Sequence, residues 1–506
     1  MTALRAPRYA PAHSARLKAA ARSAPSALPV PIDPARTQGL VMRGFNLGFN
    51  RYLALTVRDP AAARAFIGSL VTGDQAWPRI TTAAQWLPPA PNRCLSIAFT
   101  YVGLEALGLP EASLQSFQGQ PDPYPFFAGS ESRAAIVGDT GASAPANWTL
   151  SDRHFDVMLI LTGASQAVID EDSALLRPEI VKGFDDPFPG RVFDSQGLAD
   201  HNVYFGYKDG IAQPHIAGVS YLQDPDGGQA LVDPSAFMLG TGLAGNPYSG
   251  PPLPSPQPLG LHGCFGAFRI LLQDVDGFEA EVARLADDPG FRAFFGITLP
   301  DVARQAVKAL ICGRWPNGVP LSVFPVQGDK LPARMLDSKL NDFLFVLPDG
   351  EPDVDPTINP DYGSNCPVGA HIRRGNMRGS PFADTPAVYH RIMRRAEAYQ
   401  VPYDPDDRDK GERGLMGFFM GTSFSDQFEF VQRSWINNAA GFGGVGDTTD
   451  PVMGTLGDDQ GGFYETLGGL DSSYTFTPMT GFVTTKASAY CFFPGIDGIA
   501  WIASQS

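Results

Sequence analysis

The chain has 506 residues, of which 43% are hydrophobic and 18% are charged, so it is long enough to build two ordinary globular domains. Its 53 acidic residues outnumber its 38 lysines and arginines, which gives a formal net charge of -15 at pH 7. This charge disfavours nucleic acid as a partner, because nucleic acid is itself strongly negative. No run of about 18 consecutive apolar residues is present, so the sequence predicts no membrane-spanning helix and no membrane partner.

The N-terminal arm, residues 1–36, begins with a basic stretch rich in Ala, Ser and Pro that has no acidic residue before Asp33. It lacks the apolar core that a secretory signal needs, so no signal peptide is visible in this chain. We expect a flexible arm, with a weak transit-like or propeptide-like segment as the alternative. The sequence alone leaves the compartment open.

Two distant segments share one pattern: a strand, an Asp in a capping position and an amphipathic helix. The first covers residues 51–70 with Asp59 before its helix, and the second covers residues 265–285 with Asp274 before its helix. A further strand and helix are expected at residues 95–101 and 103–109. The repetition predicts an internally duplicated fold of strands and helices rather than an all-β one.

A Pro/Gly-rich connection at residues 245–258, GNPYSGPPLPSPQP, separates the two similar halves. Such a stretch cannot continue a helix or a central strand, so it marks the expected boundary. We therefore place domains at residues 37–250 and 260–506. The polar, Gly- and Asp-rich stretches at residues 349–364 and 439–469 predict surface insertions without regular structure.

Residues that bind metals are scarce. The five cysteines are widely separated and odd in number, which predicts mostly buried thiols rather than a zinc ribbon or a disulfide framework. There are seven histidines, and no zinc-peptidase, nucleophile-elbow, P-loop or dinucleotide-binding motif accompanies them. Three specific runs remain: GYKDGIAQP at 206–214, GRWPNGVPL at 313–321 and CPVGAHIRRGNMR at 366–378. Taken alone, Asp209 in the first run would be a turn residue, and His371 in the third a core histidine.

Together with FVTTKASAYCFFP at 482–494, these runs resemble the dye-decolourising peroxidases, in the right order and from about Gln38 onward. The length is similar to that of the long fungal members. The resemblance implies an α+β fold of two ferredoxin-like domains, with antiparallel sheets and peripheral helices. The domain at 37–250 would carry the distal Asp, and the domain at 260–506 would bind haem b. Resemblance to fungal relatives also favours an extracellular location.

The resemblance assigns roles on both sides of the haem. His371 occupies the position of the axial ligand to the haem iron. Asp450, in the DPVMG segment at 450–454, is expected to accept a hydrogen bond from the other ring nitrogen, with Glu429 as the alternative. Asp209 occupies the position of the acid-base group that takes a proton from H2O2 and returns it to the departing oxygen, and this role predicts an acidic optimum.

Further positions follow from the same resemblance. Arg394, in HRIMR at 390–394, is expected to steady the negative charge that develops on the departing oxygen, in preference to Arg391 or Arg395. Arg378 matches an arginine that meets a haem propionate, with a surface salt bridge as its alternative. Leu415 matches an apolar position of the distal wall. The sequence departs from the family at Gly417, where relatives continue with an aromatic residue, so the width of the pocket is open.

Two further sites concern the electron donors. Tyr399 aligns with a family tyrosine that relays electrons from bulky dyes, with a half-buried, hydrogen-bonded tyrosine as the alternative. Some fungal members oxidise Mn2+, which prefers carboxylate oxygens. Asp353 and Asp355, in an acidic loop with Asp349 and Glu351, are candidates for such a site, and a solvated acidic loop is the alternative.

The sequence thus predicts a haem-dependent peroxidase that uses H2O2 to oxidise dyes and phenolic or lignin-related compounds by one-electron steps, with Mn2+ as a further candidate substrate. Its expected partners are H2O2 and small aromatic reductants. One alternative is a haem-binding or haem-handling protein with incidental peroxidase activity, although simple carriage requires neither Asp209 nor Arg394. A haem-free interaction module would leave His371 as a packing residue.

Overall fold

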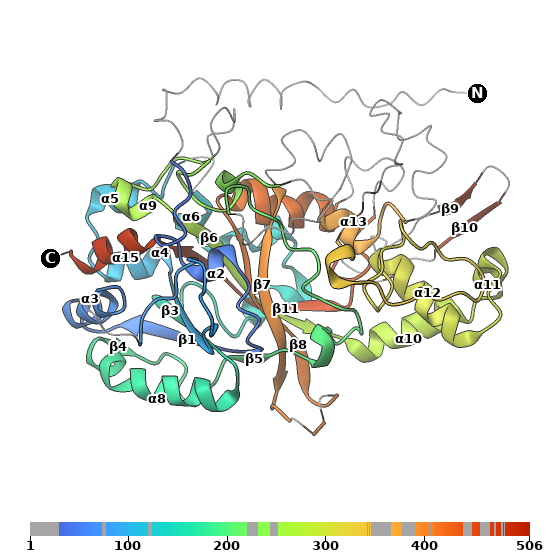
Figure 1. Ribbon diagram of the computed structural model, residues 1–506, viewed down its shortest axis with the longest axis horizontal. Helices are drawn as coiled ribbons and strands as arrows, with labels where there is room; N and C mark the ends of the chain where they lie inside the picture. The colour runs from blue at the N-terminus through green and yellow to red at the C-terminus, as the bar shows by residue number, and fades with distance from the viewer. Residues whose placement is uncertain are drawn as a thin grey trace, which may run out of the picture.

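The computed structural model describes residues 30–505, except for 73–76, 120–123, 220–230, 243–250, 342, 344, 346–365, 377–389, 405, 408, 439–447, 456–465, 470–471, 477–478 and 480. Its centre is a nine-stranded sheet in which every strand pairing is antiparallel (Figure 1). All five cysteines are buried and free, as predicted.

The N-terminal half contributes four strands in the order β4-β1-β3-β2, with two long helices between them. Asp59 caps the first helix, because its side chain accepts a hydrogen bond from the Ala62 amide at 3.0 Å. The elements in chain order are β1 (Phe49–Val57), α3 (Pro60–Ser69), β2 (Arg93–Phe99), β3 (Val157–Gly163), α8 (Gln166–Gly183) and β4 (Phe184–Asp185).

The C-terminal half repeats this topology, in the order β11-β6-β8-β7. Asp274 caps its first helix by accepting from the Gly277 amide at 2.9 Å, so the predicted pair of capped strand-helix units is confirmed. The elements are β6 (Cys264–Gln273), α10 (Val275–Ala286), α11 (Pro289–Phe295), α12 (Pro300–Cys312), β7 (Met393–Val401), β8 (Glu412–Gly421) and β11 (Val483–Phe493). In each half the strands follow the 4-1-3-2 order of a ferredoxin-like unit, which confirms the predicted α+β fold.

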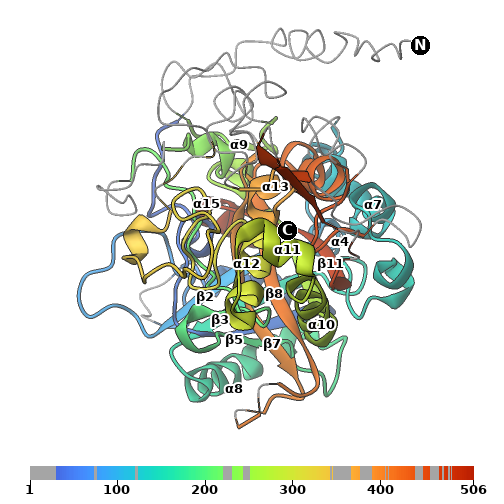
Figure 2. The same ribbon diagram turned by 90° about the vertical axis from the view of Figure 1, so that its right-hand side faces the viewer.

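The two halves share one sheet and one core. They meet where Phe99 of β2 pairs with Phe492 of β11, and β5 (Asp194–Gln196) pairs with β1 while lying against β7. The sheet therefore curls until its two edges approach each other. Its concave face encloses a cluster that includes Tyr52, Ile160 and Phe418. Figure 2, seen from the side of α10, α11 and α12, shows the helices outside this curled sheet.

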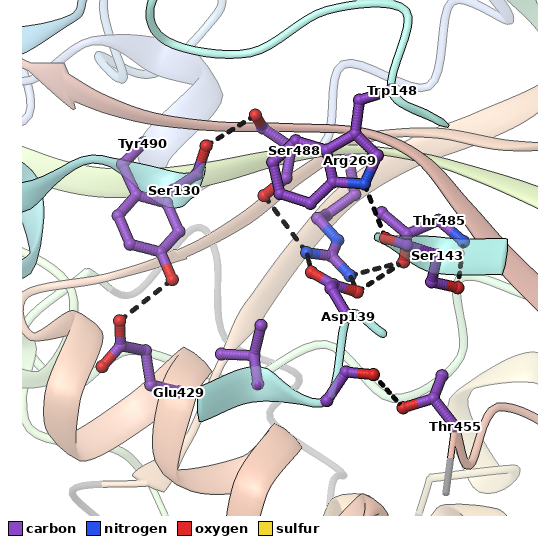
Figure 3. A network of polar contacts seen from close by, with 12 residues as sticks. Ser130, Asp139, Ser143, Trp148, Arg269, Glu429, Thr455, Thr485, Ser488 and Tyr490 are labelled. Atoms are coloured by element: carbon purple, nitrogen blue, oxygen red, sulfur yellow. Dashed lines mark hydrogen bonds and ion pairs between the residues drawn. The ribbon is translucent and has the colours of Figure 1, made fainter. Parts of the chain in front are cut away.

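A buried ion pair joins the halves (Figure 3). The Arg269 guanidinium of β6 donates to both carboxylate oxygens of Asp139, at 2.5 and 2.6 Å, and also to Thr485 and Ser488 of β11 at 2.7 and 3.1 Å. Arg269 and Asp139 are both buried, and each is only 3% exposed. Removing one partner of such a pair costs about 3–5 kcal/mol, because the other charge is left buried and unpaired. The pair therefore fixes the seam between the halves.

Shorter elements surround the sheet. The helices are α2 (Gly39–Met42), α4 (Tyr101–Ala106), α5 (Glu111–Gln115), α6 (Tyr124–Ala128), α7 (Ser130–Arg133), α9 (Gln257–Gly260), α13 (His371–Gly375) and α15 (Ile496–Ala503), with π-helical turns at Phe424–Phe428 and Val431–Ile436. None of the helices in the described ranges is long and apolar enough to cross a membrane. A separate hairpin pairs β9 (Thr466–Gly469) with β10 (Ser472–Thr475).

The predicted insertions and boundary are only partly visible. Residues 466–469 form β9, so the end of the predicted insertion at 439–469 has regular structure after all; pairing with β10 supplies the backbone hydrogen bonds that its composition did not suggest. The whole of the predicted insertion at 349–364, and residues 245–250 of the predicted boundary at 245–258, lie outside the described residues. The limits of the two domains stay a prediction.

Candidate active site

A cavity of about 430 Å³ lies between the loop at 201–213, the sheet and α13. Its walls come from β6, β7 and β8, from α13 and from the π-helical turns, and α13 packs against both α12 and the second of these turns. The volume is within the range of sites that bind small molecules and cofactors. His371, Asp209, Arg394 and Leu415 all line it, so the cavity brings together residues that are up to 206 positions apart in the sequence.

On one side of the cavity, His371 begins α13 and meets a buried carboxylate. Its Nδ1 lies 2.9 and 3.1 Å from the two carboxylate oxygens of Asp450, which is fully buried. The backbone amides of Val452 and Met453 donate to Asp450 at 2.9 and 3.0 Å, which fixes the carboxylate. Because the carboxylate accepts from Nδ1, the proton of a neutral ring resides there and Nε2 keeps its lone pair.

The electrostatics of this pair favour the ionised carboxylate. Burial by itself would raise the pKa of Asp450, but the adjacent His371, its hydrogen bond and the charge of Arg374 together hold that pKa below its usual value. Arg374 is also fully buried and donates to Thr448 at 2.5 Å and to Trp435 at 3.1 Å. It therefore ties α13 to the segment that carries Asp450.

Glu429, the alternative partner of His371, is held elsewhere. Arg133 donates to its two carboxylate oxygens at 2.8 and 2.5 Å, and the Tyr490 hydroxyl donates to it at 3.0 Å. Figure 3 shows the contact between Tyr490 and Glu429 beside the ion pair of Arg269. Of the two acids that the sequence left open, Asp450 is the one within hydrogen-bond distance of His371.

On the other side of the cavity, Asp209 projects from a tight turn. Gly206 and Gly210 have φ values of 84° and 75°, which only glycine adopts without strain, and the Asp209 amide donates to the His201 carbonyl at 2.7 Å. The Asp209 Oδ1 atom lies 3.6 Å from Nη2 of Arg394, with side-chain exposures of 34% and 41%. Asp209 and Arg394 are therefore adjacent, accessible from the cavity and loosely paired.

The neighbouring arginines are arranged differently. Arg395 also lines the cavity, but its guanidinium donates to the Leu40 carbonyl and to Gln213, both at 2.8 Å. Arg391 lines the cavity, and its Nε is buried without a hydrogen-bond partner in the described part of the chain. Burial, reinforced by the charge of Arg394, lowers the pKa of Arg391 to about 10.

The apolar wall explains the departure at position 417. Leu415 pairs with Leu271 of β6 and with Ala398 of β7, and all three apolar residues line the cavity. At Gly417 an added Cβ would lie 2.1 Å from the Arg395 carbonyl oxygen, so β7 leaves no room for any side chain. Phe419, two residues further along β8, lines the cavity instead.

Tyr399 lies inside the molecule, at 1% exposed, on the same face of β7 as Arg395. Its hydroxyl donates to the Glu412 carboxylate at 3.1 Å, and burial together with that carboxylate raises the pKa of the phenol far above its usual value. Arg378, Asp353 and Asp355 lie outside the described residues. No group of three or more His, Cys, Asp or Glu side chains that could hold a metal ion occurs among the residues that the structure describes.

No protein-family model matches the chain. A dye-decolorizing peroxidase of Mycena epipterygia is 30% identical over 505 residues, which cover 94% of this chain and 87% of that protein. Peroxidase 2 of Mycetinis scorodonius is 27% identical over 96% of this chain and 90% of its own length. The chain belongs to the dye-decolourising peroxidase family.

Solved structures of this family agree in fold. A dye-decolorizing peroxidase in complex with 2,6-dimethoxyphenol superimposes with a TM-score of 0.72 at 24% identity, covering 94% of this chain and 100% of the other. A dye-decolorizing peroxidase from Auricularia auricula-judae gives a TM-score of 0.71 at 23% identity and the same coverage. These structures support the fold, and the 30% identity to the Mycena epipterygia enzyme shows that the chain is a peroxidase of a family that uses haem.

The residues of the cavity fit a haem. His371 offers an imidazole nitrogen with a free lone pair, and apolar side chains form the walls. Arg314, at 4% exposed, and Arg391 bring two enclosed guanidiniums whose Nη2 and Nε atoms, respectively, have no partner in the described chain. Buried cations without partners are costly, and carboxylate groups such as haem propionates would satisfy them.

Sequence reasoning missed several of these residues. Arg314 stands in the GRWPNGVPL run, but nothing in the run says that its guanidinium lines the cavity. Arg391 was weighed only as a rival of Arg394. Glu397 also lines the cavity, and the sequence gives no signal for it, because a residue three positions after Arg394 on a strand points to the opposite face.

Proposed function

We propose that this chain binds haem b through His371 and uses H2O2 to oxidise dyes and phenolic compounds by one-electron steps. The observation that carries the proposal is one cavity in which the hydrogen-bonded pair of His371 and Asp450 faces the adjacent pair of Asp209 and Arg394. A phenol as reductant is supported by the solved relative that holds 2,6-dimethoxyphenol.

The proximal residues have a holding role. His371 would hold the haem iron through Nε2, while Asp450 keeps the proton on Nδ1 and increases the electron density of the ring. When it is bound, haem supplies the iron chemistry that cleaves the O–O bond and accepts electrons singly. Arg314 and Arg391 would meet its carboxylates, and Arg378 stays a predicted partner of the same kind.

The distal residues move one proton and stabilise one charge. Asp209 in its ionised form takes a proton from H2O2 and delivers it to the departing oxygen, so that this oxygen leaves as water. Arg394 is a permanent cation beside Asp209 and stabilises the negative charge that develops during the cleavage. Leu415 and Phe419 give the cavity an apolar wall, which limits competition from water.

Tyr399 is proposed to relay electrons from dyes that are too large for the cavity. Its hydroxyl already donates to Glu412, so oxidation of the phenol has an acceptor for the phenolic proton at 3.1 Å. Because Tyr399 is buried, the dye would contact the surface above it rather than the ring itself. Oxidation of Mn2+ at Asp353 and Asp355 stays a prediction of the sequence alone.

A haem-handling protein is the remaining alternative, and one experiment separates it from a peroxidase. The haem-loaded protein is mixed with one equivalent of H2O2 at acidic pH, and its Soret absorption band is followed in a stopped-flow instrument. We expect the band to fall and shift within milliseconds and to recover when a phenol is added. A Soret band that does not respond to H2O2 would support haem handling instead, and the absence of any Soret band would remove both functions.

A further inference from the structure

Glu397 is a carboxylate of the active-site cavity to which the reaction described above gives no role. It lies on β7, three residues after Arg394, and lines the same cavity. Successive side chains of a strand point to opposite faces, so Arg394 and Glu397 approach the cavity from the two sides of β7. An added Cβ at Gly197 would lie 3.1 Å from Oε2 of Glu397, which places the carboxylate against the chain next to β5.

The Glu397 side chain has no hydrogen bond and no ion pair in the part of the chain that the structure describes. A cation on the same strand does not serve it, because the guanidinium of Arg395 is turned toward Leu40 and Gln213. Glu397 is half-buried, and a carboxylate that is partly removed from water with no cation beside it is destabilised when ionised, so the protonated form is favoured.

The remaining titratable groups around Glu397 can be taken element by element. On its own strand, Tyr399 donates to Glu412, and on β1 the Tyr52 hydroxyl donates to the Met416 carbonyl at 3.3 Å. On β5, Asp194 is paired with Arg51 on the opposite side. The loop at 201–213 contributes its carboxylate, Asp209, together with His201 and with Lys208, which is paired with Asp337.

Among these groups, Asp209 is the one whose charge acts on Glu397. Burial, and then the negative charge of Asp209, raise the pKa of Glu397 to about 7. A negative charge on Asp209 opposes the ionisation of Glu397, because the two carboxylates line the same cavity. Over the acidic range in which a carboxylate base is expected to work, Glu397 is therefore a neutral acid and holds a proton.

The overall reaction needs such protons. Reduction of peroxide follows H2O2 + 2 e− + 2 H+ → 2 H2O, and Asp209 supplies neither proton, because it returns to the departing oxygen the one that it took. A phenol oxidised inside the cavity brings its own proton. A donor that gives electrons from a distance does not, so those two protons must reach the cavity through the protein or its water.

We propose that Glu397 is a positioning residue that holds a proton in the cavity and passes it toward Asp209 whenever the electrons arrive without protons. The O–H bond of the Glu397 carboxylic acid breaks, the proton moves through cavity water to the Asp209 carboxylate, and solvent reprotonates Glu397. Asn46, Asn50, Thr162 and Gln213 also line the cavity and offer hydrogen-bond partners to such water. The proposal rests on the peroxidase function proposed above.

Infrared spectroscopy of the holoenzyme tests the protonation state directly, without reference to activity. Difference spectra between about pH 5 and about pH 9 should contain a carboxylic-acid C=O band that disappears with a midpoint near pH 7. The band should be missing in Glu397→Gln and shifted in Glu397→Asp. If wild type and Glu397→Gln give the same spectra in this region, Glu397 does not hold the proton and the proposal fails.

Kinetics test the transfer. With ferrocyanide, which gives an electron and no proton, kcat of Glu397→Gln should fall at least about tenfold at acidic pH, and Glu397→Asp should recover part of the loss. With a small phenol the same variant should lose little, and kcat/KM for H2O2 should stay within about twofold of wild type. Glu179→Gln, on the exposed face of α8, is the matched control and should behave as wild type. Equal kcat values for ferrocyanide in wild type and Glu397→Gln would contradict the transfer.

The two proposals fail in different ways. If the wild-type protein itself does not react with H2O2, the peroxidase function is wrong, and the infrared band still reports whether Glu397 is protonated. If wild type reacts with H2O2 and Glu397→Gln oxidises every electron donor at the wild-type rate, the proton role alone is wrong.

Discussion

The two sides of the cavity are built on opposite principles. On the proximal side, Asp450 is fully buried, lies 2.9 Å from His371 and accepts two backbone amides, so the pair has a single arrangement. On the distal side, the side chains of Asp209 and Arg394 are 34% and 41% exposed, and their nearest charged atoms are 3.6 Å apart. The proximal pair is fixed, and the distal pair retains freedom to move.

This difference follows from what each side must do. A ligand that holds a cofactor benefits from a fixed tautomer and orientation, which a buried and fully hydrogen-bonded carboxylate provides. A group that takes a proton and then returns it must accept more than one hydrogen-bond arrangement in each cycle. A tight salt bridge to Arg394 would stabilise one ionisation state of Asp209 and oppose the transfer.

The largest effect is expected on the distal side. Asp209→Asn removes the base but keeps the shape of the side chain, so the rate of reaction with H2O2 should fall by about 10²- to 10⁴-fold. Stopped-flow absorption at the Soret band measures this rate. Haem content should remain that of wild type, and an unchanged peroxide rate would remove Asp209 from the mechanism.

Arg394→Leu should cost somewhat less, about 10²- to 10³-fold in kcat/KM for H2O2, because charge stabilisation is lost while the base remains. Steady-state kinetics with H2O2 as the varied substrate measure the loss. Arg395→Leu offers the contrast, since its guanidinium is turned toward Leu40 and Gln213 and should matter for folding rather than for the peroxide step. If Arg395→Leu folds correctly and loses more kcat/KM for H2O2 than Arg394→Leu does, Arg395 rather than Arg394 is the residue that stabilises the charge.

Asp450→Asn tests the proximal side. The neutral amide keeps the volume but loses the charge that fixes the His371 proton, so haem affinity or activity should fall by about 10- to 100-fold. Haem affinity is measured by titration of the apoprotein. Glu429→Gln is the control, because Glu429 contacts Arg133 and Tyr490 rather than His371. If haem affinity fell in Glu429→Gln but not in Asp450→Asn, Glu429 would be the functional partner of His371.

The smallest effect is expected at Tyr399, which touches neither pair. Tyr399→Phe removes the hydroxyl that donates to Glu412, and turnover of bulky dyes should fall a few-fold while that of small phenols is unchanged. Loss of the hydrogen bond should also cost about 1 kcal/mol of unfolding free energy. Tyr403→Phe, at a tyrosine that is 45% exposed, is the nearby control. Equal losses for large and small reductants would end the relay proposal.

Much of the fold could be predicted from the sequence, because its signals are local. The alternation of β1, the apolar run of β6 and the capping residues Asp59 and Asp274 depend on neighbours within a few positions, and both strand-helix units formed as expected. The short β9 was missed, since its pairing with β10 depends on a partner rather than on its own Gly-rich composition. The ion pair of Asp139 and Arg269 joins residues 130 positions apart, and no local pattern predicts it.

The site divides in the same way. The motif around His371 and the turn around Asp209 could be found, because each is a compact run of unusual residues. The choice between Asp450 and Glu429, and between Arg394 and its neighbours Arg391 and Arg395, depends on contacts with residues far away in the sequence. The partnerless state of Glu397 could not be predicted at all, because it results from where Arg395 turns rather than from any residue pattern.

One measurement tests the division between a fixed proximal pair and a mobile distal pair most directly. The rate at which haem leaves the protein for excess apomyoglobin is compared in wild type, Asp209→Asn and Asp450→Asn. The account predicts that Asp209→Asn, although inactive toward H2O2, retains haem as wild type does, whereas Asp450→Asn releases haem about 10- to 100-fold faster. Haem loss that is equally fast in both variants, or faster in Asp209→Asn, would contradict it.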